Sequence, residues 1–215
     1  MNHTRAMHTL LIITAVLVAG CEKEASDEID FGSIENSVYS NEYFGLKVTL
    51  PADWTAQDQA AQRKLSEDGA RMLAGDNKSL QAAMRASELQ TVNLFMAFKH
   101  PIGAPVDFNP SIMGIAERIR HMPGIKKGKD YLFHARKAME AGQIKMSITK
   151  EISTEQVAGR AFDVMHIEIP GANVKARQKY YATIIKGYAL VLIVSFSTDE
   201  EQSALEDILE SVTLN

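Results

Sequence analysis

Cysteine is almost absent from this chain, since Cys21 is the single one among 215 residues. A lone thiol excludes intramolecular disulfides and thiolate metal sites, which need two or more cysteines. Long apolar runs are also scarce. The one compact run, residues 10–18, has about half of the ~20 residues that a membrane-spanning helix needs. The sequence contains no G-x-S-x-G motif, no phosphate-binding loop and no dinucleotide fingerprint. We therefore predict a protein that is not an enzyme and that uses no cofactor.

An excess of basic side chains is missing as well. The chain has 23 Lys and Arg against 27 Asp and Glu, a formal net charge of −4. Without residues 1–20, which contain Arg5, 22 basic residues face the same 27 acidic ones, and the charge is −5. This acidic balance argues against nucleic acid as a partner.

The N-terminus has the pattern of an export signal. Arg5 supplies a positive start, the apolar run follows, and the small residues Ala19 and Gly20 lead into Cys21. The segment 17–21, LVAGC, resembles the lipobox of bacterial lipoproteins. The resemblance implies that residues 1–20 are a signal peptide that is removed, and that the Cys21 thiol is diacylated with chains such as palmitate. Two chains anchor a protein stably to a membrane, where one does not. The alternative is a buried structural thiol.

Residues 21–36 form an acidic segment after the cysteine, and we expect it to be an extended tether. It has few apolar residues with which to build a core. A solvated leader without a length requirement is equally compatible with this composition. Residues 37–215 fit one globular domain, long enough to bury roughly 70% of the surface of the unfolded chain.

Apolar patterning predicts both strands and helices in the domain. Strands are expected at 38–39, 46–50, 90–99, 144–148, 160–169, 175–185 and 188–196, the last apolar on both faces and so central in the sheet. Helices are expected at 56–89 with breaks at Gly69 and at 75–77, after Asn109-Pro110, at 129–142, and at 198–212 behind a capping box. We predict an α+β fold, a mostly antiparallel sheet with helices on both faces.

Both ends of the domain resemble the PsbP-like superfamily, which includes DcrB-like bacterial lipoproteins. The segment 43–54, YFGLKVTLPADW, looks like the opening hairpin of that family. The segments 179–181 and 187–192, followed by the helix at 205–212, look like its closing section. The resemblance implies an α/β/α sandwich that binds or assembles without catalysis. The stretch 56–142 offers no motif to match, and fold alone does not assign function.

The histidines give no metal-ligand spacing. His100, His121, His134 and His166 remain after the signal peptide, and no two stand two apart on a strand or three to four apart on a helix. His166 shares a strand face with Glu168, which could form a ligand pair but more often is a histidine beside a carboxylate on a wet face. We predict no metal site.

Ser147 and Lys150 match the S-x-x-K pattern of a serine nucleophile with a lysine base. That chemistry needs the two side chains one helical turn apart. The segment alternates as a strand, in which residues three apart point to opposite faces. An envelope hydrolase using Ser147, Lys150, His166 or Glu168 is therefore the least favoured function.

Six basic residues are candidate contacts to an anionic surface: Lys126, Lys127, Lys129, Lys175, Arg177 and Lys179. They belong to a basic segment, 117–137, and to a strand on which positions 175, 177 and 179 share one face. Docking on anionic lipid head groups or on an acidic partner is the functional interpretation. A solvated helix surface and lysines that protect a sheet edge are the simpler one.

The aromatic residues Tyr39, Tyr43, Phe44 and Trp54 cluster at the opening hairpin. They could line a small apolar pocket, but large aromatics at such a corner are more often core. The 10 methionines indicate adaptable packing and, weakly, a binding groove.

These features predict a lipid-anchored protein of the bacterial cell envelope that faces the periplasm. Its partners would be the membrane, through Cys21, and an envelope protein or lipid. We expect a non-catalytic binding or assembly module. The first alternative is a carrier or sensor of a lipid or other apolar ligand, with a pocket between sheet and helices. Glu22-Lys23 after the cysteine departs from the aspartate signal for inner-membrane retention, which leaves both membranes open.

Overall fold

The structure, a computed structural model, describes residues 30–171 and 173–215. The main sheet consists of β4 (Thr55–Ala56), β5 (Thr91–Phe98), β6 (Ser111–Arg118), β7 (Ser147–Ile148), β8 (Ser153–Val157), β9 (Arg160–Ile169), β10 (Ala176–Ile185) and β11 (Tyr188–Phe196). Its strand order is β4-β5-β6-β11-β10-β9-β7, and β8 also pairs with β9. All of these pairs are antiparallel, as predicted.

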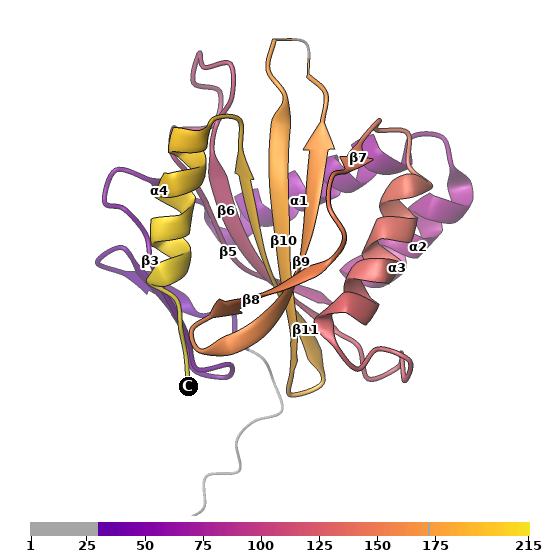
Figure 1. Ribbon diagram of the computed structural model, residues 1–215, viewed down its shortest axis with the longest axis horizontal. Helices are drawn as coiled ribbons and strands as arrows, with labels where there is room; N and C mark the ends of the chain where they lie inside the picture. Colours follow the sequence, from indigo (N-terminus) through magenta and orange to yellow (C-terminus); the bar gives the residue numbers. More distant parts are fainter. Residues whose placement is uncertain (1–29, 172) are drawn as a thin grey trace, which may run out of the picture.

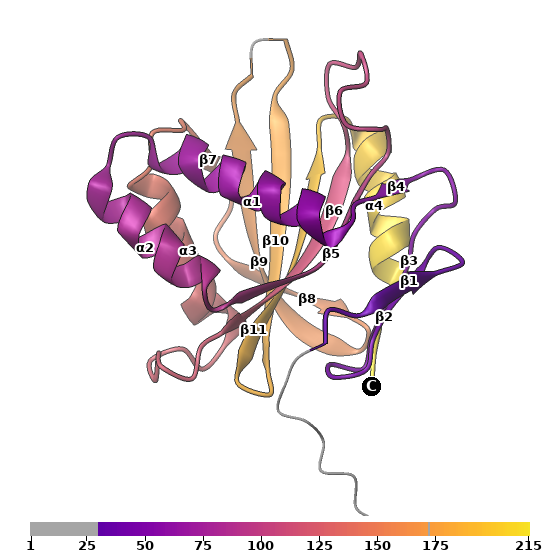
Figure 2. The ribbon, with the colours of Figure 1, turned by 180° about the vertical axis from the view of Figure 1, so that it is seen from behind.

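A second, small sheet and four helices complete the described part of the chain. The small sheet has the order β1-β2-β3-β12, with β1 (Ser33–Glu35), β2 (Val38–Asn41), β3 (Leu46–Thr49) and β12 (Thr213–Leu214). The helices are α1 (Gln59–Ala74), α2 (Lys78–Glu88), α3 (Gly128–Glu140) and α4 (Asp199–Glu210). In Figure 1, α4 lies in front of the main sheet, and in Figure 2, seen from behind, α1 crosses the opposite face, with α2 and α3 next to each other at its side.

The prediction that the strand 188–196 is central is confirmed. β11 lies between β6 and β10, and every residue from Tyr188 to Phe196 is buried. Its alternate side chains serve two separate cores, because successive residues of a strand point to opposite faces. Leu190 and Leu192 pack on the side of α4 and the small sheet, whereas Val191 packs on the side of α3. The sheet is therefore covered on both faces, as the α+β prediction requires.

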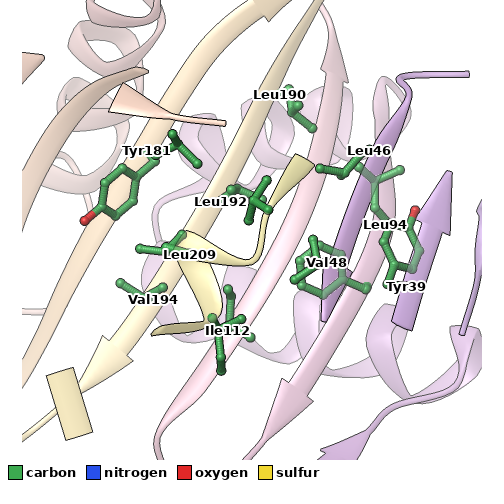
Figure 3. Packing of buried hydrophobic residues seen from close by; sticks show 14 of the residues in the cluster. Tyr39, Leu46, Val48, Leu94, Ile112, Tyr181, Leu190, Leu192, Val194 and Leu209 are labelled. Atoms are coloured by element: carbon green, nitrogen blue, oxygen red, sulfur yellow. The ribbon is translucent and has the colours of Figure 1, made fainter. Parts of the chain in front are cut away.

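The α4-side core joins elements that are distant in the sequence. Leu46 and Val48 of β3 pack with Leu192 of β11 and Leu209 of α4 (Figure 3). The capping box at the start of α4 is confirmed, because the Thr198 side chain accepts from the Glu201 backbone N–H at 3.2 Å and the Glu201 carboxylate accepts from the Thr198 backbone N–H at 3.2 Å. This pair of hydrogen bonds satisfies donors that a helix start leaves unpaired.

The helix predicted after Asn109-Pro110 is wrong, because residues 111–118 form β6. Ile112 and Ala116, four apart, share a face in a strand as they would in a helix, so the pattern was ambiguous. Asn109 does not cap a helix: its side chain accepts from the His100 backbone N–H at 2.9 Å and donates to the His100 carbonyl at 2.8 Å, closing the β5–β6 loop. Pairing with β5 and β11 along its whole length then fixes β6 as a strand.

Three boundaries also differ from the prediction. The helix at 56–89 breaks at Gly75 but not at Gly69, which lies inside α1. Of the strand expected at 144–148, only Ser147 and Ile148 pair with β9. Part of the segment expected to be tether contacts the small sheet, because Ser33–Glu35 pairs with β2 and Asn41 donates to the carbonyl and the side chain of Asp30.

Cys21, the predicted signal peptide 1–20 and the tether up to residue 29 lie outside the described residues. Among the residues that are described, no helix has the length and apolar character to cross a membrane.

Candidate functional site

An apolar pocket of about 320 Å³ lies between the main sheet and the helices on its α1–α2 side. α1 contributes Ala70, α2 contributes Ala83 and Met84, and β6 contributes Met113 and Ile115 to its walls. A volume of this size is at the lower end of the range for small-molecule sites, which are concave and mostly apolar.

A second pocket, of about 250 Å³, adjoins the first on the side of α3. The two share the lining residues Met84, Ser87 and Ala138. The walls of the second pocket include Met122 and Met139, and methionine side chains adapt their shape to what they contact. We call the two together the helix-side pocket.

Glu117 lines the second pocket and is its polar centre. The Tyr131 hydroxyl of α3 donates to Glu117 Oε2 at 2.8 Å, and the Ser87 hydroxyl of α2 donates to Glu117 Oε1 at 2.8 Å. Burial raises the pKa of Tyr131 well above its usual value, and the charge of Glu117 raises it further. The phenol therefore stays protonated and remains a donor to the carboxylate.

Local sequence signals place the helices around this pocket. Asp58 and Asn77 are the N-caps of α1 and α2, and their side chains accept from the backbone N–H groups of Ala61 and Leu80. Gly128 lets the start of α3 approach β10, because a Cβ there would lie 2.0 Å from the Ala182 carbonyl oxygen. The caps define where α1 and α2 begin, and the close approach at Gly128 brings the start of α3 against the sheet.

A polar pocket of about 240 Å³ lies on the α4 side of the sheet. It brings together several predicted candidates: Lys150, His166, Glu168, Arg177 and Lys179. Ser147 is not among its lining residues, so the structure does not unite the S-x-x-K pair there. The hydrolase alternative gains no support from this arrangement.

Two of the three cations that line the polar pocket, Arg177 and Lys179, are paired with carboxylates of α4. Lys179 lies 3.0 Å from Glu206, and the pocket residue Glu168 pairs at 2.8 Å with Lys175, which lies outside the lining. Arg177 lies 2.9 Å from Asp199, and its guanidinium stacks over the Phe196 ring at 4.8 Å from the centroid. These ion pairs partly offset the positive charge that Arg177 and Lys179 present to the pocket.

The pKa of His166 is lowered in this pocket. Burial lowers its pKa, and the nearby charges of Lys150 and Lys179 lower it further, against an opposing effect of Glu155. His166 Nε2 lies 4.0 Å from Glu155 Oε1. Within residues 30–171 and 173–215, no group of three or more His, Cys, Asp or Glu side chains is placed to hold a metal ion.

The structure separates the six basic candidates into two groups. Lys175, Arg177 and Lys179 lie in or next to β10, with Arg177 and Lys179 facing α4, whereas Lys126, Lys127 and Lys129 lie at the start of α3, which packs on the opposite face of the sheet. Lys126 and Lys127 are exposed. Their docking on an anionic surface stays a prediction.

The aromatic cluster is core rather than a pocket. Tyr39 and Phe44 are fully buried in the α4-side core, with Tyr43 and Trp54 packed against them. Sequence reasoning missed Ser87, Glu117 and Tyr131 as site residues. The only available signal was the abundance of methionine, and two of those methionines, Met84 and Met113, do line the helix-side pocket.

No protein-family model and no curated protein matches this chain. Solved structures do. The cyanobacterial PsbP (CyanoP) from Synechocystis sp. PCC 6803 is 12% identical with a TM-score of 0.50, covering 86% of this chain and 96% of that one. LpqN, involved in cell envelope biogenesis of Mycobacterium tuberculosis, is 14% identical with a TM-score of 0.44, covering 86% of each chain. PA94 from Pseudomonas aeruginosa, a protein of unknown function, is 11% identical with a TM-score of 0.42, covering 56% of this chain and 81% of that one. The similarity to CyanoP shows that the domain has a PsbP-like fold.

Proposed function

We propose that this protein is a lipid-anchored lipoprotein of the bacterial cell envelope, facing the periplasm, whose PsbP-like domain is a non-catalytic binding module for an apolar ligand such as a lipid. The observation that carries the proposal is the helix-side pocket. It occupies the position between sheet and helices that the carrier alternative requires. We also propose that, within the PsbP-like proteins, this domain is most similar in type to the DcrB-like lipoproteins.

The chemistry of the pocket walls supports an apolar ligand. Leu80, Met84, Met113 and Ile115 supply the apolar surface of the first cavity. Burying a ligand against such walls stabilises the complex by roughly 25 cal/mol per Å² of apolar area removed from water. The thioethers of Met84 and Met113 can repack around ligands of different shape.

An assembly module is the second candidate, and one observation favours it. The β5–β6 loop carries two large apolar side chains in solvent, Ile102 at 53% and Val106 at 41% exposure. Asp107 in that loop accepts from Asn173 in the β9–β10 loop at 3.2 Å, which joins the two loop tips. Exposed apolar groups of this kind mark contact sites for other proteins when they gather in one patch.

Purification of the full lipidated protein in a mild detergent, with mass spectrometry of proteins and small molecules, separates the two candidates. We expect a near-stoichiometric apolar molecule. A near-stoichiometric protein without such a molecule would favour the assembly module instead.

A matched pair of variants tests whether the helix-side pocket is the site. Ala83 lines the pocket, whereas its neighbour Ala82 does not. We expect Ala83→Phe to weaken binding of the neutral fluorescent probe N-phenyl-1-naphthylamine at least ~10-fold, because the ring occupies the cavity. Ala82→Phe adds the same ring outside the pocket and should bind the probe as the wild type does. Equal binding by both variants would contradict the assignment.

Membrane attachment through Cys21 has its own test. Cys21→Ser should move the protein from the membrane fraction to the soluble fraction, since no acyl chain can then be attached through a thioether or thioester. Retention of the variant on membranes at the wild-type level would contradict the lipoprotein assignment.

A further inference from the structure

We propose that Glu117 makes the helix-side pocket selective for apolar ligands that carry a cationic amine head group. This inference rests on the proposed function and adds to it the chemical class of the ligand. An alkyl chain would occupy the apolar cavity next to Met84 and Ile115, and the ammonium group would lie against the carboxylate.

The charge of the pocket walls is the first argument. Neither cavity has a lysine or an arginine among its lining residues. Glu117 lines the second cavity and Glu88, which is exposed, lines the first, while the exposed His134 also lines the second. Arg71 and Arg85 line a neighbouring pocket that shares Glu88 with the first cavity, so the negative charge without a cationic neighbour in the pocket wall is that of Glu117 in the second cavity.

The hydrogen bonds of Glu117 are the second argument. An ionised carboxylate has about four acceptor positions. Tyr131 and Ser87 each use one, and Glu117 forms no ion pair with any residue that the structure describes. Both donors are neutral, so the charge of the carboxylate is stabilised but not cancelled. An ammonium group from a ligand can donate to the positions that remain.

The partly buried position of Glu117 is the third argument, because it strengthens the expected preference for a cationic head group. Glu117 is partly buried on β6 beneath α2 and α3, where charges interact more strongly than in bulk water. Tyr131 and Ser87 hold its two oxygens from two different helices. A fixed carboxylate beside an apolar cavity favours a cation over a neutral head group and disfavours an anion, which it repels.

Displacement of N-phenyl-1-naphthylamine from the full chain tests this selectivity. The competitors are dodecylamine, dodecanol and dodecanoate, which share the alkyl chain and differ in head-group charge, each used below its aggregation concentration. We expect dodecylamine to displace the probe at a concentration at least ~10-fold below that of dodecanol, with dodecanoate the weakest. Equal potency of dodecylamine and dodecanol would overturn the inference.

The variant Glu117→Gln then assigns the selectivity to this carboxylate. The amide keeps the size and the acceptor for Tyr131 but removes the charge. The advantage of dodecylamine should fall to below ~3-fold while displacement by dodecanol stays unchanged. Glu200→Gln, at the exposed start of α4 on the opposite face of the sheet, is the control and should keep the wild-type preference. A preference that survives in Glu117→Gln would overturn the inference.

The two proposals fail in different ways. If all three alkyl compounds displace the probe equally, the pocket binds apolar ligands but the selectivity is wrong. If the probe does not bind the wild type at all, both the proposed function and this inference are wrong. The comparison of competitors on the wild type decides the selectivity even if Glu117→Gln does not fold.

Discussion

Lys179 Nζ lies 3.0 Å from Glu206 Oε1, an ion pair that connects β10 to α4. The two partners differ in burial, because the Lys179 side chain is 12% exposed and the Glu206 side chain 48%. Gln202 also donates to the same oxygen at 2.7 Å. The pair therefore joins a largely buried cation to a solvated carboxylate on the helix that covers the sheet.

The first prediction follows from this asymmetry. Glu206→Gln should lower the free energy of unfolding by about 1.5 kcal/mol, because it removes the charged acceptor of a buried ammonium group. Lys179→Met should cost less than about 0.5 kcal/mol, since the solvated carboxylate loses little and the methionine keeps the packing. Urea denaturation of both variants measures the difference. A larger loss for Lys179→Met would contradict it.

The second prediction concerns the start of α4. Thr198→Ala removes the side-chain oxygen that accepts from the Glu201 backbone N–H, and it should cost about 1 kcal/mol of stability. Ser203→Ala, an exposed position inside the same helix, is the control and should change the stability by no more than about 0.5 kcal/mol. The shift in the midpoint of thermal unfolding distinguishes the two.

Much of this fold was predictable where local pattern and tertiary environment agree. The strand at 188–196 is apolar on both faces and is buried on both faces. The helix from Thr198 has a capping box and apolar residues at helical spacing, and both features are found in the structure. In such segments the sequence pattern that defines the element is the same one that packs it.

In other segments, the type of secondary structure depends on long-range contacts that the local sequence pattern does not indicate. The region of Ile112 and Ala116 fits a helix or a strand, and only pairing with β5 and β11 decides between them. β12 is two residues long and exists because Leu214 pairs with Leu46 of β3. The main site was missed for the same reason: Ser87, Glu117 and Tyr131 come from three elements, and no spacing within the chain indicates that they meet.

The third prediction compares two glycines that the sequence does not distinguish. Gly114→Ala should cost about 1–3 kcal/mol, because a Cβ there would lie 2.4 Å from a ring carbon of the buried Phe95. Gly69→Ala should stabilise the protein by roughly 0.5–1 kcal/mol, since Gly69 lies inside α1 with no atom within 4 Å of the added carbon. Chemical denaturation of the two variants should give effects of opposite sign.

The last prediction concerns the dependence of stability on pH through His166. Its pKa in the fold is lowered below the ordinary 6.5 by burial and by the charges of Lys150 and Lys179, so the native state resists protonation where the unfolded chain accepts a proton. Stability contributed by neutral His166 is therefore complete above pH 6.5 and is lost as the pH falls from there toward the lowered pKa. His166→Gln should flatten the pH profile of the unfolding free energy in this window.

The variant Lys150→Met tests the cause of the lowered pKa of His166. It should raise the NMR titration midpoint of His166, because it removes one of the two positive charges that disfavour the protonated imidazole. A midpoint unchanged or lowered in Lys150→Met would show that this lysine does not act on His166.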